Sequence, residues 1–376
     1  MRPLPPMLLV LLLWCAGLGA AAQFGKISIL YEDLRASYGG SGEVALGLVV
    51  SIVGMVGLIF GTTAGLLVAR IGPRRAIVAA LAAGAAMSAL QSLMPAYPLM
   101  LASRIIEGAS HLAIVVVGPT MIAALAPENR RPLAMTLWSS FFGVTYTILA
   151  LIGPYSSPIG LFLGTLALPR RPEPKGQARP MGNLLRQPAE ISPSPRLAAP
   201  AMGFCCYTFL YVAVLTLLPP ETPMTHRALI AAGMPLVSIA VSLTLGVWLL
   251  SRMSAVRLVQ TGYAIAIPGF VILWALWGQG AGMVAGGVLL SGALGIVQGA
   301  SFASIPELNA GAEDRARAAG AVAQLGNLGT TTGTPVLAAL LASAGPAGLG
   351  LAAVLLCGLG IAIHTLQKAR RDALPQ

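Results

Sequence analysis

Charged residues are scarce in this chain. Of its 376 residues, 9% are Asp, Glu, Lys or Arg, whereas 56% are hydrophobic. Soluble globular domains carry about a quarter of charged residues. The scarcity of charge therefore excludes an ordinary water-soluble domain.

Cysteine and histidine are also few, with four and three residues respectively. Cys205 and Cys206 are adjacent, and Cys15 and Cys357 stand alone in apolar runs. None of these spacings is typical of a zinc site or a disulfide framework. The chain also lacks the Gly-x-x-x-x-Gly-Lys-Ser/Thr loop that binds nucleotide phosphates. We therefore expect no metal, no cofactor and no ATP-driven step.

Long apolar runs dominate the chain instead. Runs such as 44–69, 76–93 and 283–305 are almost free of charge over the 18 or so residues that span a bilayer. The sequence predicts an all-α membrane protein with twelve transmembrane helices. These are expected near residues 7–30, 44–69, 75–93, 97–125, 133–153, 155–169, 199–219, 228–250, 255–277, 279–305, 318–343 and 347–367.

The distribution of basic residues supports twelve crossings. If 133–169 crosses twice, with a turn at Gly153-Pro154, nineteen Lys and Arg residues fall in inside segments and only Arg35 and Arg227 fall outside. Cytoplasmic loops are enriched in Lys and Arg. We therefore expect both termini in the cytoplasm and the protein in a cell membrane, such as a bacterial inner membrane.

The enrichment of Lys and Arg in cytoplasmic connections also explains the net charge of +11. The basic residues occupy short connections rather than an aromatic-interleaved basic domain, so no nucleic-acid partner is expected. The N-terminal segment imitates a signal peptide, with Arg2 before an apolar run and small residues before Gln23. Because apolar character continues past residue 23, we expect an uncleaved first helix.

The only long polar stretch divides the chain into two related halves. We expect a six-helix bundle over 1–169, a cytoplasmic linker over 170–198, a second bundle over 199–368 and a cytoplasmic tail over 369–376. Glu107-Gly108-Ala109-Ser110 recurs as Gln298-Gly299-Ala300-Ser301, at corresponding places in the two halves. Such duplication is typical of transporters built from repeats.

The connection between the second and third helices resembles the signature loop of the major facilitator superfamily, and the resemblance covers essentially the whole chain. That loop has Gly, three residues, Asp, Arg, any residue, Gly and then basic residues. Here the acidic position is Ala69. The resemblance implies a gate, although the arginines alone could simply fix topology. The implied gating residues are Gly65, Arg70, Gly72, Arg74 and Arg75.

The fourth predicted helix carries charge inside the apolar core. Arg104, Glu107 and His111 are spaced by three and four residues, which places them on one helical face. Charges at such depth are costly and usually face a bundle interior or a water-filled cavity. We expect Arg104 to bind an anionic substrate, and Glu107 and His111 to carry the coupling proton. The alternative is an Arg104–Glu107 pair that only joins helices.

Further polar residues complete the predicted substrate site. Lys26 shares a face of the first helix with Gln23, although an end position would also suit snorkelling to the interface. The eleventh helix has a run of small and polar residues, which permits close packing or a break beside a cavity. The remaining candidate substrate-binding residues are Tyr146, Tyr207, Tyr211, Gln324 and Asn327.

These observations predict a secondary active transporter for a small organic or inorganic anion, with protons as the coupling ion. The pattern around Arg104 and the Gln324 to Thr331 run resemble the cyanate and small-anion permease branch of the superfamily. A multidrug or metabolite efflux antiporter is the alternative within the superfamily. An intramembrane enzyme or a non-transporting scaffold is the alternative from another class. The expected partners are the small-molecule substrate and the lipid bilayer.

Overall fold

Helices form most of the described structure, a computed structural model that describes residues 5–29, 31–38, 43–152 and 193–373. The first half contains α1 (Pro6–Ile29), α2 (Tyr31–Tyr38), α3 (Glu43–Ile71), α4 (Pro73–Ser92), α5 (Tyr97–Leu125), α6 (Arg131–Ser139) and α7 (Phe141–Ile152). The second half contains α10 (Ala198–Glu221), α11 (Met224–Val241), α12 (Val247–Leu250), α13 (Ala255–Ala275), α14 (Gly280–Leu308) and α15 (Ala312–Asp372). The predicted fold class is confirmed.

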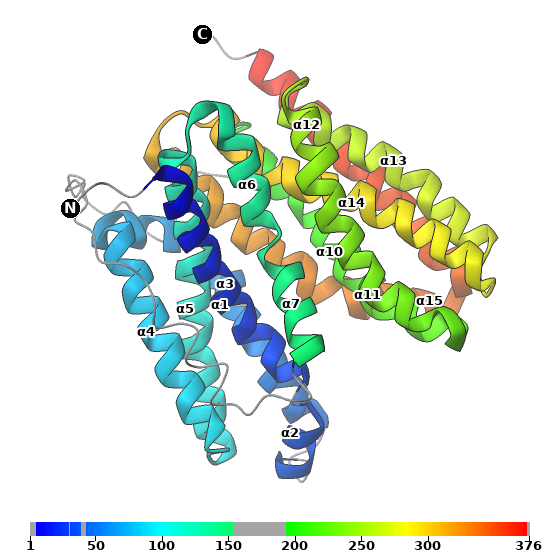
Figure 1. Cartoon of the computed structure of the whole chain (residues 1–376), viewed down its shortest axis with the longest axis horizontal. Coiled ribbons are helices and arrows are strands. Elements are labelled where there is room, and N and C mark those ends of the chain that lie inside the picture. Colours follow the sequence, from blue (N-terminus) through cyan, green and yellow to red (C-terminus); the bar gives the residue numbers. More distant parts are fainter. Residues whose placement is uncertain (1–4, 30, 39–42, 153–192, 374–376) are drawn as a thin grey trace.

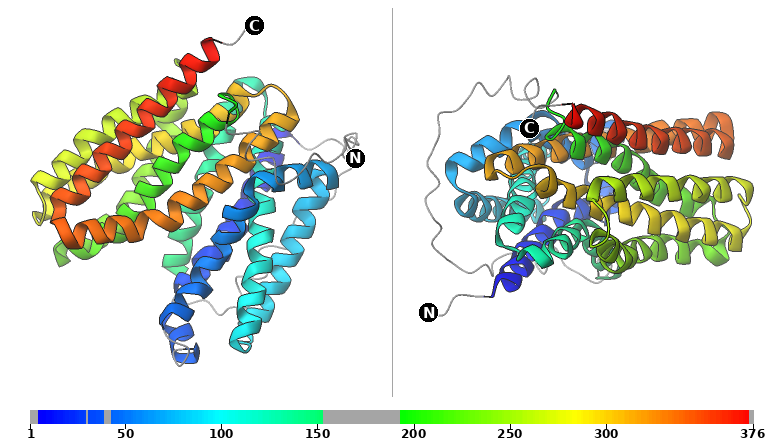
Figure 2. Two further views of the ribbon diagram at one scale, coloured as in Figure 1. Left: turned by 180° about the vertical axis from the view of Figure 1, so that it is seen from behind. Right: turned by 90° about the horizontal axis from the view of Figure 1, so that it is seen from above.

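Eight helices of the described part are long and apolar enough to cross a membrane, by length and composition. One of them, α15, makes two crossings. Its helix is interrupted at Gly345, which has a positive φ of 64°, and the two arms run in opposite directions (Figure 2). The 29-residue α3 and the α6–α7 pair add two more. The described residues thus provide eleven crossings, and the predicted crossing at 155–169 and the Gly153-Pro154 turn lie outside them.

Three local features depart from the sequence prediction. The short helix α2 follows the first crossing. The fifth crossing is interrupted at Ser140, whose N–H bonds to the carbonyl of Leu137 in a tighter turn. Between α11 and α12, residues Ser242–Gly246 form a π-helical turn. Such turns are insertions within an α-helix and are rarely visible in hydropathy patterns.

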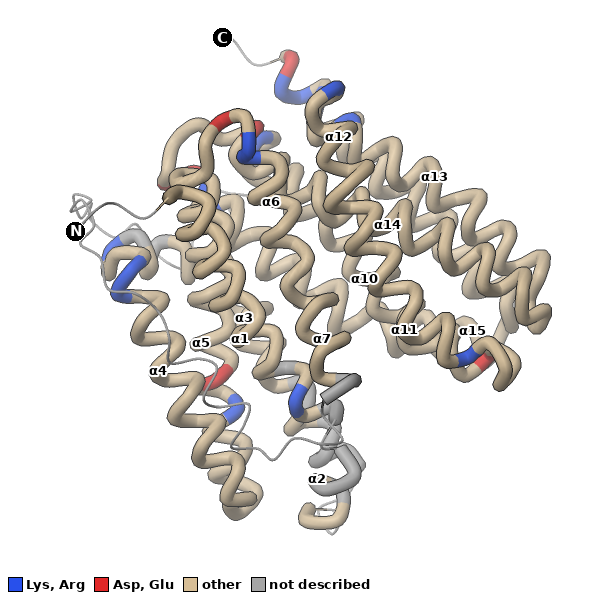
Figure 3. Tube along the Cα trace, in the orientation of Figure 1, with Lys and Arg blue, Asp and Glu red and all other residues tan. Residues whose placement is uncertain are grey.

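The helices form two bundles that meet at one end and diverge toward the other (Figure 1). Lysines and arginines gather where the bundles meet (Figure 3). This end carries the last turn of α3 with Arg70, the start of α4, the α5–α6 connection and the last turn of α15 with Arg370. We call it the basic end. All described connections that were expected inside therefore share one end of the molecule.

Small residues allow the two bundles to touch near the basic end. A Cβ atom added at Gly65 of α3 would lie 2.7 Å from the carbonyl oxygen of Ala316 of α15. At Gly61 it would lie 2.5 Å from Cβ of Gln324. Both distances are shorter than van der Waals contact, so only glycine fits there. Close approach of helix backbones through small residues is typical of membrane bundles, where water does not drive association.

Candidate functional site

The face of α5 predicted from spacing is buried inside the first bundle. Arg104 and Glu107 are both 0% exposed and His111 is 4% exposed. At a rise of about 1.5 Å per residue, Glu107 lies about 15 Å from the start of α5 at Tyr97. The charges therefore lie well inside the apolar layer, at the side of its middle that is away from the basic end.

Glu107 is the centre of the charged site. Its Oε1 lies 2.5 Å from Nζ of Lys26 on α1. Its Oε2 accepts hydrogen bonds from Nη1 of Arg104 at 2.5 Å and from Nε2 of Gln91 on α4 at 2.9 Å. A buried charge costs several kcal/mol unless it is paired and hydrogen-bonded. Both carboxylate oxygens meet this condition.

Arg104 joins α5 to two neighbouring helices through main-chain carbonyls. Its Nη1 donates to the carbonyl of Gln23 on α1 at 2.7 Å, and its Nε donates to the carbonyl of Val49 on α3 at 3.0 Å. A planar guanidinium with several fixed donors suits this role. The Arg104–Glu107 pair, which the sequence offered as the alternative to a substrate site, therefore exists, and Arg104 also joins α5 to α1 and α3.

Lys26 points into the bundle rather than toward the interface. Besides Glu107, its ammonium group donates to Oγ of Ser88 on α4. The snorkelling alternative is therefore not what the structure shows. The Lys26 side chain is 10% exposed, whereas the side chains of Arg104 and Glu107 are fully buried. Lys26 is thus the most accessible of the three charged groups.

A second layer of polar contacts lies one turn deeper. Nε2 of Gln23 lies 3.1 Å from Oγ of Ser110, which donates to the carbonyl of Ala80. Nδ1 of His111 lies 2.9 Å from the carbonyl oxygen of Ala20. Because a carbonyl only accepts, this contact places the hydrogen of a neutral His111 on Nδ1. His111 thereby has a fixed orientation toward α1.

Gln91, Ser88 and Ser103 were missed as site residues by the sequence analysis. Gln91 donates to Oγ of Ser103 at 3.0 Å as well as to Glu107. The only signal was that Ser88 and Gln91 are spaced by three residues on the predicted third helix. That spacing says that they share a face but not which helix this face meets.

The predicted residues of the second half have other surroundings. Tyr207 and Tyr211 on α10 are buried and stacked, with ring centroids 5.1 Å apart. Gln324 donates to the carbonyl of Leu58 on α3, and Asn327 donates to the carbonyl of Ala323 one turn back on α15. The Tyr146 side chain lies outside those that the structure describes. The described contacts of these residues do not join them to Glu107, so their role as substrate ligands stays a prediction.

The predicted gating residues lie at the basic end. Gly65 makes the close approach to Ala316 described above. Gly72 has a positive φ of 91° and precedes the first turn of α4, a conformation that favours glycine. Arg70 and Arg75 are exposed and Arg74 is half-buried. The loop therefore lies where the bundles meet, and its gating role stays a prediction.

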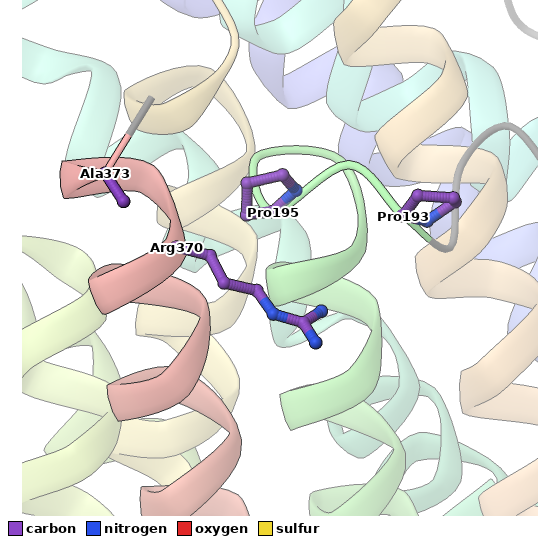
Figure 4. Close-up of a pocket in the computed structure, with 4 residues that line it drawn as sticks. All are labelled: Pro193, Pro195, Arg370 and Ala373. Atoms are coloured by element: carbon purple, nitrogen blue, oxygen red, sulfur yellow. The ribbon is translucent and has the colours of Figure 1, made fainter. Parts of the chain in front are cut away.

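A cavity of about 330 Å³ lies elsewhere at the basic end, beside the last turn of α15 (Figure 4). Its lining includes Pro193, Pro195 and Arg370. Arg371 donates to the carbonyl of Pro195 next to it. This cavity belongs to the end of the second bundle and is separate from the Glu107 site.

The described structure is that of a polytopic helical membrane protein with charged residues buried inside its first bundle. The sequence profile of the Major Facilitator Superfamily matches residues 9–334. The chain belongs to this superfamily of secondary transporters.

Individual proteins agree with this membership. The chain is 30% identical over 115 residues to the inner membrane transport protein YajR of Escherichia coli K12, a match that covers 31% of this chain and 25% of YajR. Among solved structures, the E. coli fucose:proton symporter FucP has a TM-score of 0.77 at 16% identity, covering 99% of this chain and all of that one. The human organic anion transporter MFSD10 has a TM-score of 0.78 at 17% identity, over 96% of this chain and 100% of its own. At these identities the two solved structures show the fold alone.

Proposed function

We propose that this protein moves a small anion across the membrane together with a proton, by alternating access between the two bundles. The observation that carries the proposal is the charge of the buried site. Lys26 and Arg104 supply two positive charges against the single negative charge of Glu107. The site is therefore positive, and in poorly solvated surroundings its excess positive charge attracts an anion.

Lys26 is the group that the anion meets first in this proposal. The sequence favoured Arg104 as the main ligand, but Arg104 is fully buried and engaged by two carbonyls and Glu107. Lys26 is the least buried of the three charged side chains, and its contacts within the described part of the chain are with the side chains of Ser88 and Glu107. Arg104 instead supports Glu107 and supplies positive potential to the site.

Coupling follows from competition for Lys26. An ionised Glu107 holds the ammonium group of Lys26, and protonation of Glu107 removes that attraction. The anion then takes the place of the carboxylate beside Lys26. The empty, ionised site and the loaded, protonated site both carry a net charge of +1. The change of access from one side of the membrane to the other therefore costs similar electrostatic energy in these two forms. The protonated empty site would carry a net charge of +2.

Several features outside the charges support this proposal. The solved structures of similar fold include fucose:proton and proton:xylose symporters, so the fold accommodates proton symport. The sequence patterns near Arg104 and Gln324 resemble the cyanate and small-anion permease branch. In this proposal the basic end lies on the cytoplasmic side of a bacterial inner membrane, because connections rich in Lys and Arg stay on that side.

The test is uptake of small carboxylates and cyanate-like anions into liposomes that contain the purified protein. Lys26→Met should abolish uptake, whereas Glu107→Gln should keep counterflow of labelled anion and lose accumulation driven by a pH gradient. Lys368→Gln, which removes an exposed lysine near the end of α15, is the matched control and should behave as the parent. Normal uptake by Lys26→Met, or uptake restricted to cations, would contradict the proposal.

A further inference from the structure

Two glutamines of the second bundle reach across to main-chain carbonyls of the first. Nε2 of Gln298 on α14 donates to the carbonyl of Ser139 at 2.7 Å. Nε2 of Gln324 on α15 donates to the carbonyl of Leu58 on α3, also at 2.7 Å. Both side chains are partly buried. These bonds join the halves on two separate pairs of helices.

The two carbonyl acceptors lie at similar depths, measured along their helices from the basic end. Ser139 lies eight residues into the fifth crossing, about 12 Å from its start at Arg131, and Leu58 lies about 18 Å from Arg70. The glycine contacts at Gly61 and Gly65 lie between Leu58 and the basic end. The two glutamines therefore lie within the region where the bundles are in contact, which extends past them to Gly57 and Gly143.

The break in the fifth crossing creates one of the acceptors. The α-helical pattern stops at Ser139 and resumes at Phe141. Carbonyls at the end of a helix lack their usual partner four residues on, and in an apolar layer each needs a donor from elsewhere. The Gln298 amide supplies such a donor to Ser139 from the other half. The carbonyl at the break therefore has this hydrogen bond only while the two bundles are in contact.

We propose that Gln298 and Gln324 form an amide latch that holds the basic end closed, in place of an ionic gate built on an acid at position 69, where this chain has Ala69. An amide donor has two consequences that an ion pair does not have. It carries no charge to desolvate, and it does not titrate. These two bonds are thus independent of pH, while the proton acts at Glu107.

Alternating access requires this end to open, so both hydrogen bonds must break in every cycle. A hydrogen bond of this kind changes an equilibrium by about 2- to 12-fold. Removing one donor should shift the population toward the state that is open at the basic end by this factor. Because the two bonds lie on different helix pairs, removing both donors should multiply the two effects. The proposal rests on alternating access alone and not on the identity of the substrate.

The test measures access to the contact between the bundles. Ala316 is buried against Gly65 at the basic end, so the alkylation rate of Ala316→Cys reports opening there. It is measured in a background in which the four native cysteines are replaced by alanine. Gln298→Met and Gln324→Met keep the side-chain length and lose the donor. Each should speed alkylation about 2- to 12-fold.

The matched control is Gln260→Met. Gln260 on α13 donates to Oγ1 of Thr365, so its bond stays within the second bundle. This variant should alkylate at the parent rate. Native Cys357, which is buried in the second bundle, is restored in a parallel set as a reporter of unfolding and should stay protected.

Unchanged alkylation of Ala316→Cys in both Gln298→Met and Gln324→Met would overturn the latch. If a methionine variant also exposes Cys357, the measurement is repeated with glutamate at the same position. An ionised glutamate keeps the shape but only accepts. Faster alkylation confined to Ala316→Cys then supports the latch, and a parent rate contradicts it.

Discussion

Glu107 on α5 and Gln298 on α14 occupy corresponding positions of the repeated segment, yet only Gln298 binds across the boundary between the halves. Glu107 binds Lys26, Arg104 and Gln91 within its own bundle. Gln298 reaches across to the carbonyl of Ser139 in the other bundle. The duplicated position thus holds a charged site in the first half and a neutral contact in the second. In our proposals, the position in the first half carries the coupling proton and the position in the second half holds the bundles together.

Removal of the Glu107 carboxylate should destabilise the protein strongly. Glu107→Ala leaves Lys26 and Arg104 as uncompensated buried charges, and breaking a buried ion pair costs about 3–5 kcal/mol. We expect a clear fall in Tm for the detergent-solubilised protein. The double variant Lys26→Met/Glu107→Ala removes one of the stranded cations and should recover part of the loss. Additive effects of the two changes would show that the residues do not interact.

Gly65→Ala should hinder closure of the basic end. The new methyl group would lie 2.7 Å from the carbonyl oxygen of Ala316, and main-chain atoms cannot easily move away. Overpacking of this kind costs about 1–3 kcal/mol. Because the cost falls only on the closed basic end, transport should slow while the separate bundles stay folded.

The control for this prediction is Gly358→Ala on the second arm of α15, where an added Cβ meets nothing within 4 Å. It should transport as the parent does. Equal transport rates in the parent and in Gly65→Ala would show that this contact does not limit the cycle.

Gly118→Ala should lower stability without changing the charged site. A Cβ atom there would lie 2.1 Å from Cη2 of Trp138, a side chain that is fully buried. The indole must move within a packed interior, which costs about 1–3 kcal/mol. We expect a lower Tm, with pH-driven uptake retained at temperatures below the transition. A Tm equal to that of the parent would mean that the indole relocates without strain.

Orientation in the membrane can be tested with two exposed positions. Ala96 lies in the connection between α4 and α5, away from the basic end, and Glu128 lies in the connection between α5 and α6 at the basic end. On intact cells, an impermeant thiol reagent should modify Ala96→Cys at once and Glu128→Cys only after permeabilisation. The reverse pattern would place the basic end outside.

The membrane class and most of the helices could be predicted from local sequence alone. Runs of about 20 apolar residues need a bilayer, and their lengths are set locally, so the predicted crossings agree with the described helices to within a few residues. Spacing by three also correctly placed Arg104 and Glu107 on one face of α5, because helical periodicity fixes which residues share a face. The break at Ser140 and the π-helical turn had no such local signal.

The contacts of the buried charged and polar side chains depend on how the helices pack together. Lys26 could have pointed to the interface, and its pairing with Glu107 depends on how α1 is rotated against α5. Gln91 joins the site because α4 packs on α5, and Gln324 meets Leu58 because glycines let α3 approach α15. These distances arise from packing between segments that are far apart in the chain. Local periodicity carries no information about the rotation and depth of a neighbouring helix, so the charges could be located from the sequence but not their contacts.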